Sequence, residues 1–363
     1  MNTWCPEVYR SIFVDRVNDD KIKVAPCCQA ATALESVDGF SFETSPHLSN
    51  IRAQFDQNIK APECNRCWQA EELGHKSRRQ SAIEFFNTNT PDHSVMLESI
   101  DHSSTWACNL TCVMCGPHSS SAWATEMNTS RTELIEIGRL FQKNNTFVDR
   151  LDLTQIKKIH FNGGEPLLNN DQINLLDSVD LTNTFVSYNT NGTTFPSKKL
   201  VDLWKQTRLV KLFFSIDGTK DSFEYIRYPG KWKDVAENML RMRDQLPSNV
   251  MFGFNVTIGC YNVFEIVDVW HWFNENLRTN REGDPSDFNW QFAYNYHVKE
   301  LCPAAKQAAI DHLASVEQYH GVADYLKKTI NHVPNNIWID KLDEIDARRG
   351  TNWQHTLQVG KYY

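Results

Sequence analysis

Beyond about residue 150, short apolar runs rich in β-branched and aromatic residues alternate with longer segments whose apolar residues recur at helical spacing. This alternation predicts repeated βα units and an α/β fold with a mainly parallel sheet. The expected strands are 158–162, 185–189, 210–216, 251–257 and 289–294, and the expected helices are 170–178, 197–206, 235–245 and 263–277. With a first strand at 95–100, the pattern gives about six βα units, fewer than the eight of a closed barrel.

The two ends of the chain follow other patterns. Residues 1–90 contain strand-like runs at 9–17 and 21–25 around the turn-forming Asn18-Asp19-Asp20, and then polar segments with Pro62 and Gly74. This pattern predicts a small module organised around its cysteines. Beyond residue 300, helices are expected at 303–331 and 338–349. We therefore expect three parts: a module at 1–90, the βα units at 91–300, and a helical extension at 301–363 that packs on them.

Charge and hydropathy exclude two classes of partner. The 363 residues include 37 basic and 45 acidic side chains, a formal net charge of -8, so there is no global positive field to attract nucleic acid. Apolar runs end well before the roughly 20 residues that a membrane span needs, and no signal segment begins the chain. We expect a soluble, cytoplasmic protein with no membrane contact and no general nucleic-acid binding.

Ten cysteines are spread unevenly, and eight of them lie in the first third of the chain. A disulfide scaffold would be shorter, whereas clustered cysteines in a reducing compartment more often bind metal. Cys108, Cys112 and Cys115 lie within eight residues. Three such thiolates can hold one face of an iron–sulfur cube and leave its fourth iron open to a ligand. The alternatives are a zinc site completed by His102 or His118, and cysteines that bind no metal.

A second motif follows the expected strand 158–162, which runs into Gly163-Gly164-Glu165-Pro166. Two glycines at a strand end expose backbone N–H and C=O groups to a ligand, and proline fixes the following turn. Glu165 taken alone is more often a cap or a salt-bridge partner than a catalytic group. The segment is therefore a candidate ligand loop.

Together, C-x-x-x-C-x-x-C and the later Gly-Gly-Glu-Pro resemble the motifs of the radical S-adenosylmethionine (SAM) enzymes. The resemblance implies a partial (β/α)6 TIM-like barrel in which Cys108, Cys112 and Cys115 hold a [4Fe-4S] cluster. It also implies that the open iron binds SAM, with the segment 163–165 against the methionine amino group. Cleavage of SAM would then give a 5′-deoxyadenosyl radical that abstracts hydrogen from a substrate C–H bond, while the barrel positions the substrate and excludes water.

Two later segments also resemble family motifs at strand ends, where a partial barrel places its ligand-binding loops. They are Asn-Thr-Asn-Gly at 189–192 and Ser-Ile-Asp-Gly at 215–218. The resulting candidates to face the cofactor or the substrate are Thr190, Asn191, Ser215 and Asp217. On the expected strand 251–257, Asn255 is a further candidate to bind the SAM ribose or carboxylate. Each is otherwise a turn or helix-cap residue. Met114 stands where many members have an aromatic residue, and its thioether can still pack against adenine.

A second cysteine set lies near the N-terminus: Cys5, Cys27 and Cys28, and the C-x-x-C pair Cys64 and Cys67. Four thiolates from distant segments can close one metal site and tie together a small module that lacks enough core to hold its own shape. Five cysteines compete for these four places. A structural zinc knuckle is the alternative to a cluster.

This set, with Cys-Asn-Arg-Cys-Trp-Gln-Ala-Glu from residue 64, resembles the twitch module, a shortened relative of the SPASM domain. Its place before the barrel resembles a subgroup of twitch-containing radical enzymes, as do segments 115–123 and 342–350. The resemblance implies an auxiliary [4Fe-4S] cluster and favours Cys27 over Cys28, because the family's ligand usually follows proline directly. With four protein ligands and no open iron, that cluster is expected to relay an electron or to shape the pocket.

The resemblance leaves several substrate classes open. SPASM and twitch enzymes mostly modify ribosomally made peptides, while others oxidise amino sugars or rearrange nucleotides. We rank a peptide or protein substrate first and a small molecule second, with flavodoxin or ferredoxin as the type of electron donor. The alternative to an enzyme is a non-catalytic scaffold that binds zinc or an iron–sulfur cluster. The basic run 76–79 reads as a solvated face, a helix end or a contact for an anionic substrate, and Trp290, Tyr294 and Tyr296 are candidates to face the substrate.

Overall fold

The computed structural model describes residues 3–16, 20–72, 76–87, 91–136, 151–168, 170, 172–278, 288–293 and 295–363. The expected turn residues Asn18 and Asp19, together with Gly74 and Tyr294, lie outside these described residues.

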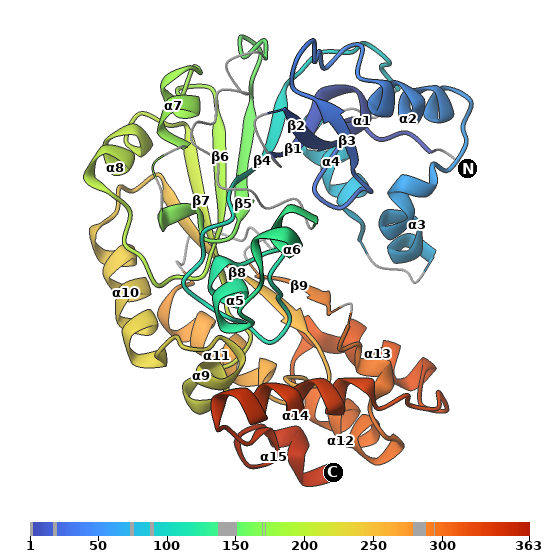
Figure 1. Cartoon of the computed structure of the whole chain (residues 1–363), viewed down its shortest axis with the longest axis vertical. Helices are drawn as coiled ribbons and strands as arrows, with labels where there is room; N and C mark the ends of the chain where they lie inside the picture. The colour runs from blue at the N-terminus through green and yellow to red at the C-terminus, as the bar shows by residue number, and fades with distance from the viewer. Residues whose placement is uncertain are drawn as a thin grey trace. The chain divides into compact units, whose positions relative to one another are not determined.

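The described strands form one nine-stranded sheet (Figure 1). Its strands are β1 Ser11–Arg16, β2 Lys21–Ala25, β3 Ala33–Ser36, β4 Ser99–Thr105, β5 Lys158–Gly163, β6 Phe185–Thr190, β7 Leu209–Ser215, β8 Val250–Ile258 and β9 Phe288–Phe292. The strand order is β3-β2-β1-β4-β5-β6-β7-β8-β9, so the described sheet has two ends and is not closed. The pairs β1–β4, β4–β5, β5–β6 and β8–β9 are parallel, whereas β1–β2 and β2–β3 are antiparallel. The prediction of an α/β fold with a mainly parallel sheet is confirmed.

The helices lie between these strands and beyond the last one. The α-helices are α1 Glu7–Arg10, α2 Pro46–Asp56, α3 Asn65–Glu72, α4 Arg78–Phe86, α5 Ser121–Glu126, α6 Arg131–Glu136, α7 Gln172–Asp177, α8 Lys198–Trp204, α9 Lys220–Ile226, α10 Trp232–Gln245, α11 Ile266–Asn276, α12 Pro303–Leu313, α13 His320–Lys328, α14 Ile337–Arg349 and α15 Trp353–Thr356. Short 3-10 turns occupy Pro62–Cys64, Pro166–Leu168, Val298–Glu300, Glu317–Tyr319 and Gln358–Tyr362. In Figure 1, α7 and α8 follow β5 and β6 in turn, as the expected βα alternation requires.

One row of aliphatic side chains fixes the register of four strands. Ile12 on β1 pairs with Ile100 on β4, Ile100 pairs with Ile159 on β5, and Ile159 pairs with Val186 on β6. All four side chains are completely buried. Because a slip of one residue would turn this row to the opposite face, burial of the row specifies the pairing.

Two expected strands begin later in the structure than the apolar pattern indicated. The strand expected at 95–100 is β4, Ser99–Thr105, and Val95 and Met96 before it are each 37% exposed. The pattern missed the later start because β4 buries polar residues such as Asp101 and His102. Similarly, the run expected at 9–17 begins with the helical turn α1, and β1 starts only at Ser11.

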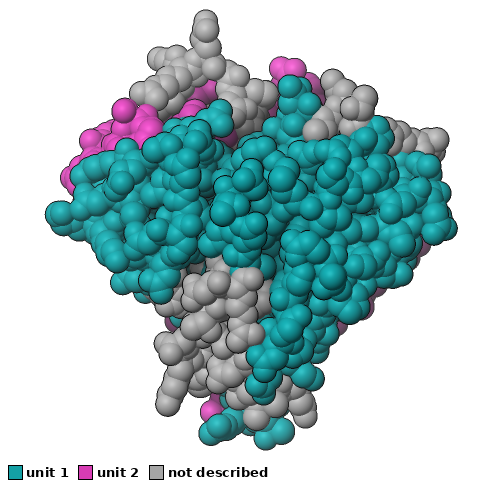
Figure 2. All heavy atoms as spheres, turned by 90° about the horizontal axis from the view of Figure 1, so that it is seen from above, with its two compact units in different colours: residues 1–107, 129–188, 197–210 teal, residues 108–128, 189–196, 211–363 magenta. Residues whose placement is uncertain are grey.

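The chain divides into two compact units (Figure 2). The first consists of Met1–Ala107, Thr129–Tyr188 and Ser197–Val210, and the second of Cys108–Asn128, Asn189–Pro196 and Lys211–Tyr363. The expected three-part division at residues 90 and 300 stays a prediction. Within the described residues, no helix combines the length and the apolar character needed to cross a bilayer.

The first unit has an apolar cluster around its N-terminal cysteines. Its buried members are Trp4, Cys5, Val8, Tyr9, Ile51, Phe55, Ala61 and Trp68. Two of them belong to α2, a helix that starts where the Ser45 hydroxyl accepts a hydrogen bond from the Leu48 N–H at 3.2 Å. Aromatic residues far apart in sequence thus meet in this module, and whether this core is enough to hold its shape without a metal stays a prediction.

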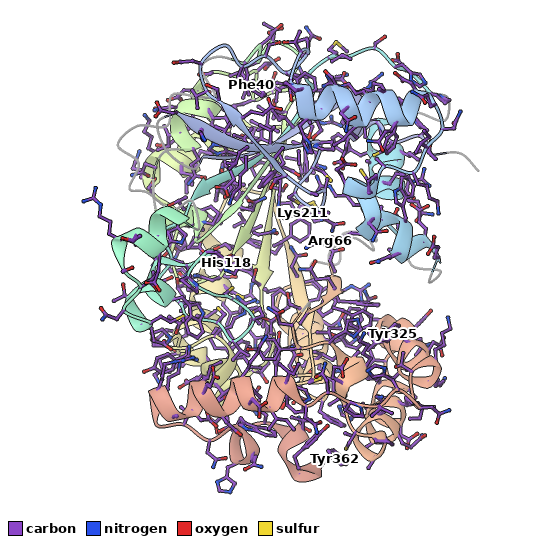
Figure 3. All side chains as sticks on the ribbon, turned by 45° about the vertical axis from the view of Figure 1, so that its right-hand side comes forward. Phe40, Arg66, His118, Lys211, Tyr325 and Tyr362 are labelled. Atoms are coloured by element: carbon purple, nitrogen blue, oxygen red, sulfur yellow. The ribbon has the colours of Figure 1, made fainter. Side chains whose placement is uncertain are left out.

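In the second unit, aromatic rings join the late strands to the C-terminal helices. Phe254 on β8 is completely buried, and its ring centre lies 4.9 Å from that of Phe273 on α11. Tyr325 of α13 contacts Phe292 at the end of β9, with ring centres 4.9 Å apart. Figure 3 marks Tyr325 and Tyr362 among these C-terminal helices.

Candidate functional site

The three cysteines of the C-x-x-x-C-x-x-C segment lie in the loop between β4 and α5, within the second unit. Cys112 is buried, Cys108 is half-buried and Cys115 is exposed. The Cys115 N–H donates to the Cys112 carbonyl at 2.9 Å, which closes a turn between them. The three cysteine residues of the loop therefore differ in exposure, from the buried Cys112 to the exposed Cys115.

Hydrogen bonds from outside the loop hold its backbone. The Thr111 N–H donates to the Tyr228 carbonyl at 2.6 Å, and the Val113 N–H donates to the Ile226 carbonyl at 2.8 Å. Side chains at the start of α5 supply three more bonds: from Cys108 N to Ser121 Oγ at 3.0 Å, from Ser120 Oγ to Leu110 O at 2.7 Å, and from Trp123 Nε1 to Cys112 O at 2.9 Å. These hydrogen bonds within the protein thus fix the backbone positions of the three cysteines.

Arg227, directly after α9, is the cation beside this loop. Its side chain is 8% exposed, and its Nη1 donates to the Cys112 Sγ at 3.8 Å. The hydrogen bond between Cys112 and Cys115 raises the pKa of Cys112 and lowers the pKa of Cys115. The positive charge of Arg227 lowers the pKa of both thiols and so favours their thiolate forms. Metal ligands must be thiolates, so this charge suits an iron–sulfur site.

Asp217 is the partner of Arg227. Its Oδ2 lies 2.5 Å from Arg227 Nη2, and its Oδ1 accepts a hydrogen bond from the Thr257 N–H at 2.6 Å. Burial raises the pKa of Asp217, against the opposing effect of Arg227. Both carboxylate oxygens are engaged by protein groups, and a contact of Asp217 with a cofactor or substrate stays a prediction.

Of the strand-end candidates, Asn191 lies nearest to the cysteines. Its Nδ2 donates to the Asn109 Oδ1 at 3.0 Å and lies 4.0 Å from the Cys108 Sγ, and its Oδ1 accepts from the Thr193 N–H at 2.9 Å. Thr190 is buried, and its hydroxyl accepts from the Gly192 N–H at 3.2 Å. Asn191 thus lies beside the cysteine loop and Thr190 shapes the turn next to it, while their contact with a cofactor or substrate stays a prediction.

Asn255 on β8 belongs to a row of amides that also includes residues of β6 and β9. Its Nδ2 donates to Asn189 Oδ1 at 2.6 Å, and its Oδ1 accepts from Asn289 Nδ2 at 3.2 Å. Such amides offer donors and acceptors to a polar ligand. Sequence reasoning did not select Asn189, near the end of β6, or Asn289, near the start of β9. Ser215, the last residue of β7, and Met114 are half-buried.

The Gly-Gly-Glu-Pro segment lies in the first unit, against the end of β4. A Cβ on Gly164 would lie 2.7 Å from the Trp106 carbonyl oxygen, and the Gly164 N–H donates to Thr105 O at 2.7 Å. Gly163 has φ +121°, which side chains rarely adopt. Glu165 is completely buried; its N–H donates to Ala107 O at 2.8 Å. The glycines thus permit close contact with 105–107, the residues directly before Cys108.

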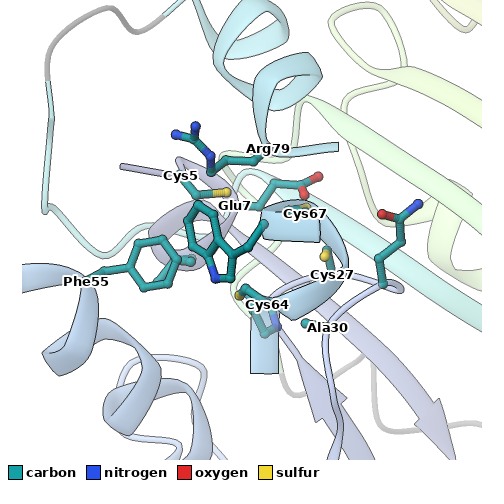
Figure 4. A pocket seen from close by; sticks show the side chains of 12 residues that line it. Cys5, Glu7, Cys27, Ala30, Phe55, Cys64, Cys67 and Arg79 are labelled. Carbon is teal, nitrogen blue, oxygen red and sulfur yellow. The ribbon is translucent and has the colours of Figure 1, made fainter. Parts of the chain in front are cut away.

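Four of the five N-terminal cysteines line one pocket in the first unit, with Phe55, Trp68 and Arg79 around it (Figure 4). These four are Cys5, Cys27, Cys64 and Cys67. Burial raises the pKa of each, for Cys64 to about 12, so they are thiols until a metal displaces the proton. The structure therefore brings together the four residues that the sequence analysis favoured.

The two kinds of metal site predicted for these cysteines differ in the spacing that they require. Zinc requires four donors about 2.3 Å from one point. No three histidine, cysteine, aspartate or glutamate side chains of the described residues are grouped closely enough to hold one metal ion. An iron–sulfur cube, in contrast, takes thiolates around a larger volume. Which of the two these cysteines hold stays a prediction.

Cys28 lies outside the pocket and belongs to a buried ion-pair network. Arg78 Nη1 donates to the Cys28 Sγ at 3.1 Å, and Arg78 also pairs with Glu7 at 2.8 Å and with Asp101 at 2.6 Å. Both carboxylates are buried, and Asp101 has a pKa of about 2, since the Arg78 charge outweighs its burial. Arg78 joins α4 to β4, a role that the sequence alone did not reveal.

The basic run 76–79 is accordingly the start of α4, as one interpretation expected, and its two arginines point inward. Ser77 and Gln80 form the capping box that begins this helix. Arg79 is 12% exposed; it pairs with Glu71 at 2.7 Å and donates to the Trp4 carbonyl at 2.7 Å. The interpretation of this run as a solvated face is wrong for Arg78 and Arg79.

The histidines considered for a zinc site have other surroundings. His102 on β4 is buried beside Phe161, and burial lowers its pKa to about 4. His118 is exposed in the loop before α5 and is marked in Figure 3. Neither joins a group of described residues able to hold a metal ion.

Residues 103–262 match the profile of the family described as the radical SAM superfamily. The match covers less than half of the chain. The matched residues include the cysteine loop, the Gly-Gly-Glu-Pro segment and the strand ends described above. The resemblance to the radical SAM superfamily that the motifs indicated is thus confirmed for these residues.

One curated relative of this chain is the GTP 3′,8-cyclase of Desulforamulus reducens, which is 31% identical over 131 residues. The aligned part is 35% of this chain and 37% of the cyclase, so the chain spans little more than a third of that relative.

Among solved structures, a histidine-tagged form of anSMEcpe with bound AdoMet has a TM-score of 0.41 at 14% identity, covering 61% of this chain and 58% of that one. Streptococcus suis SuiB has a TM-score of 0.38 at 14% identity, covering 85% and 69%. SuiB bound to the precursor peptide SuiA has a TM-score of 0.34 at 13% identity, covering 84% and 68%. These likenesses are too weak to carry an argument about the substrate.

Proposed function

We propose that this protein is a radical SAM enzyme that modifies a peptide or protein by abstracting hydrogen from a C–H bond. The observation that supports it most is the cysteine loop 108–115, whose backbone the protein holds in place within the residues that match that superfamily. A [4Fe-4S] cluster bound there would supply the electron that cleaves SAM to a 5′-deoxyadenosyl radical.

The residues of this chain have distinct tasks in the proposal. Cys108, Cys112 and Cys115 hold the cluster, and Arg227 offsets part of the negative charge of the thiolates. Asn191 orients the start of the loop through Asn109. The remaining proposed contacts to SAM are Gly163, Gly164, Glu165, Thr190, Ser215, Asp217, Asn255 and Met114.

An auxiliary [4Fe-4S] cluster in a twitch-type N-terminal module is the second part of the proposal. Its ligands are Cys5, Cys27, Cys64 and Cys67, which line one pocket and provide the soft thiolates that such clusters require. The cluster would relay an electron or shape the substrate pocket. Flavodoxin or ferredoxin is the proposed type of electron donor, and the cytoplasm the proposed location.

A small-molecule substrate is the second candidate, and one observation favours it. The curated relative at 31% identity is named for the cyclisation of GTP, a nucleotide. Assays should therefore include peptides and nucleotides side by side.

The test is iron and acid-labile sulfide in anaerobically reconstituted protein, with 5′-deoxyadenosine formation from SAM and dithionite. We expect about eight irons per chain and SAM cleavage. The Cys108→Ala/Cys112→Ala/Cys115→Ala variant should keep about four irons and form no 5′-deoxyadenosine. The Cys64→Ala/Cys67→Ala variant should lose the other four. A chain that binds zinc or iron but never cleaves SAM would overturn the proposal in favour of a non-catalytic scaffold.

A further inference from the structure

A C-terminal arginine reaches the cysteine loop from a helix far away in the sequence. Arg349 is the last residue of α14, and its side chain is 3% exposed. Its Nη2 donates to the Thr111 carbonyl oxygen at 2.6 Å and to the Thr111 hydroxyl at 2.9 Å. Thr111 directly precedes Cys112, so this guanidinium binds the backbone between the first two cysteines of the loop.

The same guanidinium contacts the residues that hold the loop from its other sides. Its Nε donates to Glu126 at the end of α5, at 3.0 Å. Its carbon lies 4.9 Å from the ring centre of Trp123 and 4.7 Å from that of Tyr228. Trp123 donates to the Cys112 carbonyl, and the Tyr228 carbonyl accepts the Thr111 N–H. Arg349 therefore contacts both Trp123 and Tyr228, the two residues that restrain the loop by hydrogen bonds.

The end of α14 is itself fixed, so that Arg349 has a rigid base. Gly350 follows in the left-handed conformation with φ +66°, and its N–H donates to the Asp346 carbonyl at 2.8 Å. The Asp346 carboxylate accepts the Trp353 N–H at 2.7 Å, and Asp343 accepts the Trp353 indole N–H at 2.7 Å. The helix and the following turn thus hold the backbone from which Arg349 extends.

We propose that Arg349 is a positioning residue for the radical SAM cluster, which keeps loop 108–115 in the geometry that its three cysteines need. This inference rests on the proposed function. The planar fork of an arginine can serve Thr111 and Glu126 at once and lie between two rings, whereas lysine presents a single point charge. No cysteine is touched by Arg349 in the described contacts, so it acts through Thr111 rather than as a ligand.

Arg348 provides a matched control on the same helix. Its side chain is 36% exposed, its Nε lies 3.9 Å from Glu126, and its guanidinium carbon is 5.7 Å from the Trp123 ring centre. It has the same charge and the same helical neighbours, and among the described residues it forms no hydrogen bond with Thr111. Substitution of Arg348 should therefore change surface charge and leave the loop as it is.

The experiment compares Arg349→Ala, Arg349→Lys and Arg348→Ala with the unmodified full-length chain after anaerobic reconstitution. We expect an iron chelator to remove iron from the Cys108 site at least about tenfold faster in both Arg349 variants, because a charged hydrogen bond to the loop is lost. The EPR spectrum of the reduced cluster should also change on SAM addition differently from that of the unmodified protein. Arg348→Ala should match the unmodified protein in both measurements.

Three outcomes are distinguishable. Equal iron-release rates and EPR spectra in Arg349→Lys and Arg348→Ala would overturn the role of Arg349, even if both variants bind SAM. If Arg349→Ala fails to fold by circular dichroism, Arg349→Lys alone decides, since it keeps charge and most of the volume. If the triple cysteine variant keeps all its iron, the proposed function itself fails, whatever the Arg349 variants do.

Discussion

The Nη1 atom of Arg78 lies 3.1 Å from the Sγ atom of Cys28. This contact gives two adjacent cysteines different surroundings, because Cys27 lines the pocket with three other cysteines while Cys28 faces a buried arginine. The Cys28 N–H is also bonded, to Asp101 at 3.0 Å. Sequence spacing alone could not decide between Cys27 and Cys28 as the proposed metal ligand. Their different surroundings give a physical reason to prefer Cys27.

Serine substitutions at these two positions should have unequal effects. Cys27→Ser is expected to remove the irons of the N-terminal site, about four of about eight, because a ligand is lost. Cys28→Ser should leave the iron content unchanged, since serine can still accept the hydrogen bond from Arg78. Iron and sulfide analysis of both variants measures this. Loss of four irons in Cys28→Ser alone would reverse the assignment.

The buried pair of Arg227 and Asp217 should be costly to break from one side. Arg227→Met leaves the Asp217 carboxylate buried without its cation, and we expect the free energy of unfolding to fall by about 3–5 kcal/mol. In Arg227→Met/Asp217→Asn the uncompensated charge is gone, so the loss should be smaller by at least about 1 kcal/mol. Urea unfolding of the iron-free proteins tests this, and strictly additive losses would contradict the coupling.

Glu265 should make stability fall as the pH rises. It is buried, one oxygen accepts the Gln358 N–H at 2.7 Å, and burial raises its pKa to about 7. Between about pH 4 and pH 7 the folded chain keeps a proton that the unfolded chain releases, so the stabilisation present at low pH is lost on going to neutral pH. Glu265→Gln should therefore be more stable than the unmodified protein at pH 8, by about 1–3 kcal/mol, and similar to it at pH 4.

The control for Glu265 is Asp268→Asn, one turn later on an exposed position. Its unfolding free energy should follow that of the unmodified protein at both pH values. A Glu265→Gln variant whose advantage is the same at pH 4 and pH 8 would show that the carboxyl does not titrate in this range.

Gly164 should not tolerate a methyl group. In Gly164→Ala the new Cβ would meet the backbone oxygens of Trp106 and Ala107, which have no room to move without shifting β4, and we expect a loss of about 2–3 kcal/mol. Gly39→Ala is the control: it has φ +74° and open space around the Cβ, so only conformational strain of about 1 kcal/mol is expected. The urea midpoints compare the two, and a larger shift for Gly39→Ala would refute the close-contact explanation.

The parts of this molecule that sequence could predict are those with a local signal. The alternation of apolar runs located β5 to β9 within a few residues, because each strand buries a continuous apolar face such as that of Ile159 and its neighbours. The spacing of Cys108, Cys112 and Cys115 likewise indicated their chemistry. Where polar residues are buried in a strand, as in β4 with Asp101, the pattern failed and the strand was displaced.

The parts that sequence could not predict depend on distant partners. Arg227 bonds a cysteine 115 positions away, and Arg349 bonds a threonine 238 positions away. The local sequence around an arginine does not indicate a contact with a residue far away in the chain. For this reason, Arg78 was interpreted as part of a basic run at the surface. Only the fold reveals that each of these cations is buried beside a cysteine segment.

The hydrogen bonds on the backbone of loop 108–115 have a consequence for how iron would be acquired. In many small metal sites the chain becomes ordered only when the ion arrives, so part of the binding free energy is consumed in ordering it. Here Thr111, Val113 and Cys112 are already bonded to α5 and to the segment after α9, and the entropy of the loop has been lost during folding. Under the proposed function, ordering of this loop would therefore consume little of the binding free energy of iron, and loading would follow folding.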